Sequence, residues 1–273
     1  MHHFAIRLRH TMLAMLKGLI VALPLILLNS ANANTLIGWQ SEQSQQRFQT
    51  SQFKQDFFQL TPHFEGQINK VFCGVASLTI VANALNVTPS NTSLPLNQLS
   101  AQEPHYHQHT SPNWSPFFHR YNQKNLLKAA QFPARALFGY PEKQRAAGQL
   151  GLNLAELQHI ATQLHLNVNS VTVRPESQQR PQQYQQLKQQ LIDTLAATDQ
   201  YVIVNYDRAS LEQRGAGHFS PLAAYDSHSD SFLIMDVSNT YQTWTWVTSP
   251  ALFNAMATKD GDHYRGFLTI TSG

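Results

Sequence analysis

Apolar positions in the first half of the chain recur with a helical period. Residues 73–87 form an apolar run that covers more than one face, which predicts a buried helix of roughly four turns. Residues 152–164 and 176–197 each carry a single apolar stripe, and Asn153 can cap the first of these helices. Two shorter helices are expected at residues 51–60 and 122–130.

The second half of the chain has a different texture. Short runs rich in β-branched and aromatic residues alternate with turn residues, which predicts consecutive strands. The expected strands are residues 168–173, 201–206, 217–225, 231–237, 244–247 and 265–270. Helices in the first half and a mostly antiparallel sheet in the second make the predicted class α+β.

The first 33 residues have the order of a secretory signal peptide. Basic residues (Arg7, Arg9 and Lys17) precede the apolar run 18–28, and small residues then lead to cleavage after Ala33. We therefore expect 1–33 to be a signal peptide and 34–273 to be a single domain. A retained membrane anchor stays open as an alternative, although the apolar run is short for a membrane span.

Removal of this leader changes the charge balance. The leader holds three of the 19 Lys and Arg residues and none of the 16 Asp and Glu residues, so the remaining chain is formally neutral with His uncharged. The basic character of the whole chain therefore gives no support for nucleic-acid binding.

Cys73 is the only cysteine of the chain, and it stands at the start of the buried helix. Exported domains usually carry cysteines in disulfide-forming pairs, so a lone thiol is either well buried or kept for chemistry. The start of a helix favours a thiolate, because free N–H groups and the helix dipole stabilise negative charge there. Cys73 is thus a candidate nucleophile, with a buried structural thiol as the alternative.

A nucleophilic cysteine needs a base, a group that orients the base, and donors for the oxyanion. His218 is the best candidate base, because it starts a strand directly after two glycines that allow close backbone approach. Asp236 lies at the end of the next strand, and an antiparallel hairpin would bring it to His218. Gln67 is the candidate oxyanion donor, together with the N–H of Cys73.

Three blocks around these candidates occur in a fixed order along the chain. The blocks are Gln67 with Phe72-Cys73-Gly74-Val-Ala-Ser77-Leu and Asn83-Ala-Leu85; Gly215-Ala-Gly217-His218-Phe219-Ser220-Pro221 with Tyr225; and Leu233-Ile-Met-Asp236-Val237. Together they resemble the phytochelatin synthase family, which belongs to the papain-like cysteine peptidases. The resemblance runs from about residue 35 to the C-terminus. It implies a papain-like fold whose helical half carries the nucleophile and whose sheet carries His and Asp.

The resemblance also implies an activity. The thiol of Cys73 would attack the Cys–Gly amide of glutathione, release glycine and form a γ-glutamylcysteinyl acyl-enzyme, with His218 as base and acid, Asp236 as orienter and Gln67 at the oxyanion. Arg208 and Arg265 match family arginines and would bind substrate carboxylates, since guanidinium binds carboxylate in a fork. Surface ion pairs are the alternative for both. No cofactor would be required, and heavy metals (Cd or Zn) would activate through a metal–thiolate substrate.

The chain departs from the family after Asp236-Val237. Plant-type members continue Ala-Arg-Phe-Lys-Tyr-Pro-Pro, whereas this chain reads Ser238-Asn-Thr-Tyr-Gln-Thr-Trp244 and so lacks two basic residues. A second glutathione is anionic and should be held less well without them. The cysteine-rich C-terminal region of the eukaryotic enzymes is also missing. We therefore expect cleavage of glutathione to γ-Glu-Cys and glycine, with weak or no phytochelatin synthesis.

Two other functions stay open. One is a papain-like peptidase acting on other peptides. The other is an exported metal-binding protein that uses the thiol and the alternating histidines of the 89–120 segment, which are weak metal candidates. These histidines are His105, His107 and His109. The expected partner is glutathione or a related γ-glutamyl thiol peptide, in the periplasm of a Gram-negative bacterium. We expect no nucleic acid and no stable membrane insertion after cleavage, while a homodimer remains open.

Overall fold

The computed structural model describes residues 36–87, 120–143, 145, 147–238 and 243–273. The described residues belong to one compact unit. The helices of the described residues are α1 (Glu42–Thr50), α2 (Gln55–Leu60), α3 (Cys73–Ala84), α5 (Gln123–Ala129), α6 (Leu154–Gln163), α7 (Pro175–Gln179), α8 (Pro181–Ala196) and α9 (Ser249–Met256), with short 3-10 turns at Thr61–His63, Ala134–Leu137 and Ala209–Leu211.

The strands form one seven-stranded sheet and a separate hairpin. They are β1 (Leu36–Gly38), β2 (Leu166–Thr172), β3 (Gln200–Asp207), β4 (Gly217–Asp226), β5 (Ser231–Ile234), β6 (Thr245–Thr248), β7 (Lys259–Asp260), β8 (His263–Tyr264) and β9 (Gly266–Ser272). The order in the large sheet is β1-β6-β5-β4-β3-β9-β2, and β7 pairs with β8. All of these pairings are antiparallel, as the sequence predicts.

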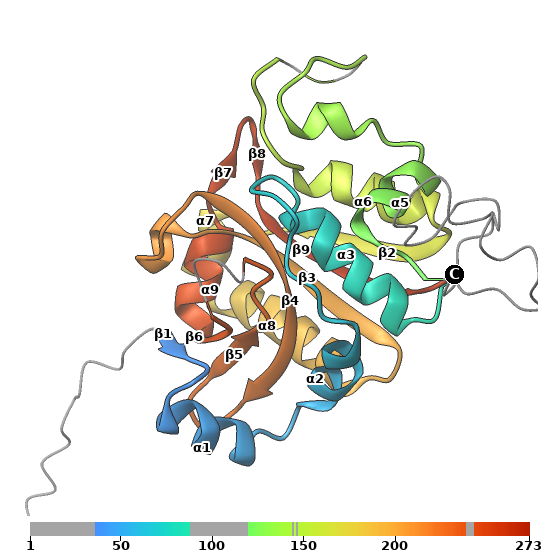
Figure 1. Cartoon of the computed structure of the whole chain (residues 1–273). Helices are drawn as coiled ribbons and strands as arrows, with labels where there is room; N and C mark the ends of the chain where they lie inside the picture. Colours follow the sequence, from blue (N-terminus) through green and yellow to red (C-terminus); the bar gives the residue numbers. More distant parts are fainter. Residues whose placement is uncertain (1–35, 88–119, 144, 146, 239–242) are drawn as a thin grey trace, which may run out of the picture. The chain divides into compact units, whose positions relative to one another are not determined.

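The sheet separates two hydrophobic cores, because alternate residues of a strand point to opposite faces. On β3, Tyr201 and Ile203 pack with α3 and α6, whereas Val202 and Val204 pack with α8 and α9. Figure 1 shows α3 on one face of the sheet and α8 and α9 on the other. The predicted α+β class is therefore confirmed.

Several predicted elements have different bounds or were not anticipated. The expected helix 176–197 is two helices, since Arg180 adopts an extended conformation and Pro181 starts α8. A residue before proline is disfavoured in the α region, which explains the break. The expected helix 51–60 begins at Gln55, and α1, α9 and β1 were not predicted.

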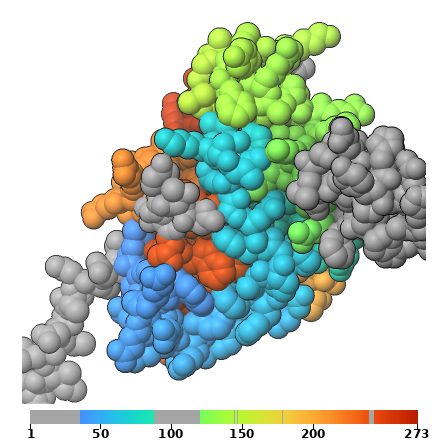
Figure 2. All heavy atoms as spheres, viewed as in Figure 1, coloured from blue at the N-terminus to red at the C-terminus, as the bar shows by residue number. Residues whose placement is uncertain are grey.

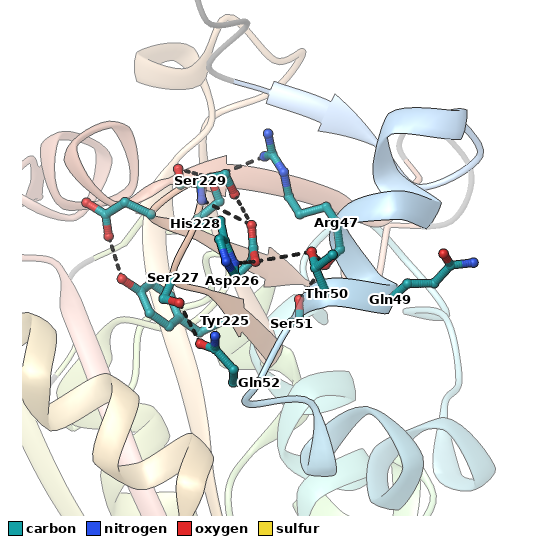
Figure 3. A network of polar contacts seen from close by, with 12 residues as sticks. Arg47, Gln49, Thr50, Ser51, Gln52, Tyr225, Asp226, Ser227, His228 and Ser229 are labelled. Carbon is teal, nitrogen blue, oxygen red and sulfur yellow. Dashed lines mark hydrogen bonds and ion pairs between the residues drawn. The ribbon is translucent and has the colours of Figure 1, made fainter.

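A polar network joins α1 to the turn between β4 and β5. Arg47 donates to the Ser231 hydroxyl at 3.1 Å, and the Thr50 hydroxyl lies 3.5 Å from Asp226 Oδ1. Asp226 also accepts a hydrogen bond from the N–H of Ser229 at 3.1 Å (Figure 3). Because Asp226 is buried, these donors compensate its loss of hydration. The network fixes the turn of the β4–β5 hairpin, which lies at the other end of β4 from His218.

Within the part of the chain that the structure describes, no helix is both long and apolar enough to span a bilayer.

Candidate active site

Cys73 is the first residue of α3 and is 7 % exposed. Phe72 precedes it, and no side chain caps this end of the helix. The first-turn N–H groups therefore remain available to an anion, as expected at an uncapped helix start. Gly74 lets α3 approach β4, because an added Cβ would lie 3.3 Å from Phe219. This close approach brings Cys73 to the strand that carries His218.

His218 and Asp236 form a buried hydrogen-bonded pair. His218 Nε2 lies 3.0 Å from Asp236 Oδ1, and the two side chains are 5 % and 1 % exposed. The pairing of Leu222 with Ile234 in the β4–β5 hairpin sets this proximity. Asp236 lies two residues beyond the end of β5, in the segment that follows the strand. With Nε2 engaged, Nδ1 is the ring nitrogen left for Cys73.

Electrostatics in this cluster favour an ion pair between the thiol and the imidazole. Burial raises the pKa of Cys73, but the charge of His218 and hydrogen bonds from His218, Phe219 N–H and Gly74 N–H lower the pKa below its ordinary value. Burial lowers the pKa of His218, but the Cys73 charge and the contacts with Asp236 raise this pKa above its ordinary value. The cluster thus favours thiolate and imidazolium, the reactive form of a nucleophilic cysteine.

Arg208 lies in the catalytic cluster, where it forms a buried ion pair with Asp236 and not a surface one. Its Nη2 donates to both carboxylate oxygens of Asp236, at 2.8 and 2.7 Å, and its side chain is 4 % exposed. The guanidinium is therefore engaged with Asp236 instead of standing free for a substrate carboxylate. Gly215, at φ +121°, makes room for it, since an added Cβ would lie 2.9 Å from Arg208 Cδ.

Two further groups complete the environment of Asp236. The Tyr206 hydroxyl donates to Oδ2 at 3.3 Å, and the N–H of Ser238 donates to Oδ1 at 2.7 Å. Burial raises the pKa of Asp236, but His218, Arg208 and the Ser238 N–H lower the pKa below its ordinary value. Tyr206 was not predicted as a site residue. Its position opposite His218 in the β3–β4 register was the available signal.

Arg265 is buried against the backbone next to His218. Its Nη1 donates to the Lys259 carbonyl at 2.6 Å, its Nη2 lies 3.8 Å from Asp260, and its Nε is buried without a hydrogen-bond partner among the described residues. A Cβ on Gly217 would clash with Arg265 Nη2. The glycine before His218 is therefore needed for this arginine.

Gln67 joins the site through its backbone. Its N–H donates to the Val237 carbonyl at 2.9 Å, next to Asp236. Its side-chain Nε2 donates to the Asn69 carbonyl at 2.7 Å, so this amide nitrogen is not free in the structure. Its Oε1 is buried without a hydrogen-bond partner among the described residues. Gln67 thus lies beside the segment that carries Asp236, with its amide directed by Asn69.

The metal candidates His105, His107 and His109 lie outside the described residues. Within the described ranges, no three His, Cys, Asp or Glu side chains come together as a metal site would require.

Comparison with known proteins agrees with the resemblance seen in the sequence. The family model described as "Phytochelatin synthase" matches residues 29–267. "Glutathione gamma-glutamylcysteinyltransferase 3" of Lotus japonicus is 24 % identical over 217 residues, which cover 79 % of this chain and 37 % of that protein. "Glutathione gamma-glutamylcysteinyltransferase 1" of Triticum aestivum is 26 % identical over 219 residues, which cover 79 % of this chain and 36 % of that protein.

Both relatives are therefore much longer than the matched segment, which spans little more than a third of each. Among solved structures, the peptidase domain of Streptococcus ComA, a bifunctional ABC transporter involved in quorum sensing, is similar at 14 % identity and a TM-score of 0.38. The match covers 77 % of this chain and 97 % of that domain, and it is too slight to carry an argument. The match of the family model over most of the sequence shows that this chain belongs to the phytochelatin synthase family.

Proposed function

We propose that the protein is a thiol-dependent acyltransferase that mainly cleaves glutathione to γ-Glu-Cys and glycine. The observation that carries this proposal is the buried Cys73–His218–Asp236 cluster at the start of α3. The relatives bear the name glutathione gamma-glutamylcysteinyltransferase, which supports glutathione as the substrate. The reaction is an acyl transfer in two steps, with His218 moving the proton in each.

In the first step, the thiolate of Cys73 attacks the carbonyl carbon of the Cys–Gly amide. The Cys73 N–H stabilises the negative charge on the carbonyl oxygen. The Gln67 amide is the second donor, once it has turned away from the Asn69 carbonyl. When the C–N bond breaks, the imidazolium of His218 gives its proton to the departing glycine nitrogen. A thioester of γ-Glu-Cys with Cys73 remains.

In the second step, water attacks the thioester, and neutral His218 accepts the water proton. The sulfur of Cys73 leaves as thiolate, and γ-Glu-Cys is released. Asp236 holds the His218 ring and stabilises its charged form throughout, while Arg208 and Tyr206 hold Asp236. These assignments give each buried polar group of the cluster a task.

Water is favoured over a second glutathione as the acceptor for two reasons. The segment after Val237 lacks the two basic residues of plant-type members. In addition, the guanidinium of Arg208 is paired with Asp236 and is therefore not free to bind an anionic acceptor.

The test is to incubate the protein with glutathione, with and without cadmium, and to identify products by mass spectrometry. We expect γ-Glu-Cys and glycine in equal amounts, and no product from Cys73→Ala. Abundant (γ-Glu-Cys)n-Gly would overturn the preference for hydrolysis. Cleavage by Cys73→Ala at the wild-type rate would overturn the mechanism.

The protein is also proposed to act after export, because residues 1–33 have the order of a signal peptide. Fractionation of the native cells should recover the processed chain, starting near Asn34, in the periplasm. Recovery of the full-length chain in the cytosol would contradict export.

A further inference from the structure

A cavity of about 880 Å³ opens between α6, the segment that precedes it, and the β7–β8 turn. Its volume lies in the range of small-molecule sites. The turn faces the preceding segment closely, since a Cβ on Gly261 would lie 3.7 Å from the side-chain amide of Gln149. Neither Cys73, His218 nor Asp236 lines this cavity, so it is distinct from the catalytic cluster.

The cavity nevertheless adjoins the catalytic cluster at two points. Leu152 lines it and lies 3.3 Å from the position of a Cβ on Gly74, the residue after Cys73. Asp260 lines it and lies 3.8 Å from Arg265, which packs on Gly217 beside His218. In Figure 2, the yellow-green surface formed by this part of the chain borders the teal surface of the segment that contains Cys73.

Arg145 is a buried cation on the cavity wall with unused donors. Its side chain is 6 % exposed, and its Nη2 donates to the carbonyl of Gly151 at 2.5 Å and of Gln149 at 3.0 Å. Its Nε lies 3.4 Å from Glu156 Oε1, too far for a good hydrogen bond. Nε and Nη1 are both buried and have no hydrogen-bond partner among the described residues. Such donors are costly to leave unmade, so they favour an incoming acceptor.

The opposite wall of the cavity is acidic. Asp260 and Asp262 flank Gly261 in the β7–β8 turn and both line the cavity. Asp262 is exposed, and Asp260 is 33 % exposed. Glu142, Lys143 and Glu156 also line the cavity, so groups of both charge signs surround it. A ligand that carries both an anionic and a cationic group can pair with each.

We propose that this cavity binds a small zwitterion, namely an α-amino acid or the end of a peptide that carries both an ammonium and a carboxylate group. The carboxylate accepts hydrogen bonds from Nε and Nη1 of Arg145, and the ammonium lies against Asp260 and Asp262. Binding does not require Cys73. The link of this site to catalysis rests on the proposed function, whose products, glycine and γ-Glu-Cys, are both zwitterions.

Calorimetric titration of the Cys73→Ala protein with L-glutamate tests the site without turnover. We expect saturable binding that is weakened about tenfold or more when the ligand is N-acetyl-L-glutamate, which lacks the ammonium, or the diamide of L-glutamate, which lacks both carboxylates. Arg145→Gln should weaken L-glutamate binding by a similar factor, whereas Arg180→Gln, an exposed arginine at the start of α8, should not.

Arg145 also supports the local backbone, so a second variant protects the test from misfolding. Asp260→Asn combined with Asp262→Asn should weaken binding of L-glutamate, which loses its ammonium contact, but should not weaken binding of N-acetyl-L-glutamate, which loses only a repulsion. Absence of L-glutamate binding would overturn the proposal. Equal binding by the Cys73→Ala protein with and without Arg145→Gln would overturn it as well. Cleavage of glutathione is not measured here, so failure of the site and failure of the proposed reaction remain distinguishable.

Discussion

Arg208 donates from one nitrogen to both oxygens of the Asp236 carboxylate, at 2.8 and 2.7 Å, in a pair that is almost fully buried. The same carboxylate binds His218. A buried carboxylate close to two basic groups stays ionised, because both partners stabilise its charge. Arg208 therefore keeps Asp236 ionised, and the ionised Asp236 stabilises the imidazolium of His218.

Loss of this arginine should destabilise the folded chain. Arg208→Gln leaves a buried carboxylate short of charge compensation, so we expect the free energy of unfolding to fall by about 3–5 kcal/mol. Denaturant titration measures this loss. Arg208→Lys keeps the positive charge but loses the planar guanidinium that contacts both oxygens, so its loss of stability should be smaller. Equal stability of Arg208→Gln and the wild type would contradict the role of the pair.

The pKa directions predict how the thiol reacts with pH. Because the pKa of Cys73 is lowered and that of His218 is raised, thiolate and imidazolium coexist below the pH at which an isolated thiol ionises. Alkylation of Cys73 by iodoacetamide should therefore persist well below the ordinary thiol pKa. In His218→Ala only burial and the N–H donors remain, so the profile should move to higher pH. A wild-type profile that matches a free thiol would contradict the ion pair.

Gly217 should be intolerant of a side chain. In Gly217→Ala the new Cβ meets Arg265 Nη2, so the guanidinium would have to leave Lys259, which Nη1 contacts, and Asp260, which Nη2 contacts. We expect kcat/KM for glutathione to fall by about tenfold or more, as misplacement of a group near reacting atoms does. Gly38→Ala, where the nearest atom lies at an ordinary 3.5 Å, is the matched control and should retain activity.

Asp56 predicts a pH dependence of stability that is unrelated to catalysis. It is 2 % exposed, its Oδ2 has no hydrogen-bond partner among the described residues, and burial raises its pKa to about 8. Between the unfolded pKa of about 3.9 and this value, the folded chain binds more protons than the unfolded chain, so stability falls as pH rises. The slope from this group is at most about 1.4 kcal/mol per pH unit.

Asp56→Asn removes this titration. The variant should be more stable than the wild type at pH 7.5 and should lose part of the decline between pH 5 and 8, as read from thermal unfolding. Asp262→Asn changes an exposed carboxylate and should leave the decline intact. An unchanged slope in Asp56→Asn would show that Asp56 is ionised in the folded chain.

The sequence was informative where local patterns decide the structure. The hairpin of two hydrophobic runs placed Asp236 near His218, because a short turn and antiparallel pairing leave few alternatives. The sequence could not reveal the partner of Arg208, since a guanidinium binds an internal carboxylate as readily as a carboxylate of the substrate. Pro181 carried the signal for the break between α7 and α8, and the apolar stripe running across it outweighed that signal in the prediction.

The cavity wall was also beyond the sequence. Arg145 lies in a segment without a regular hydrophobic period, and its burial depends on α6 and on the carbonyls of Gln149 and Gly151. Such contacts arise from tertiary packing, which no local pattern encodes.

Gln67 should matter for the rate of acylation and not for the reactivity of the thiol. Its backbone is held by the Val237 carbonyl, and its amide nitrogen donates to the Asn69 carbonyl, so the proposed role requires the amide to turn from Asn69 to the oxyanion. Gln67→Ala should lower kcat for glutathione cleavage by about 10²–10³-fold, the effect of removing one oxyanion donor. Iodoacetamide alkylation should remain as in the wild type, because it forms no oxyanion. Gln186→Ala, a glutamine on α8, is the control for a general loss of glutamine. If Gln67→Ala lost alkylation and cleavage in parallel, the role of Gln67 would instead be to hold Cys73 in place.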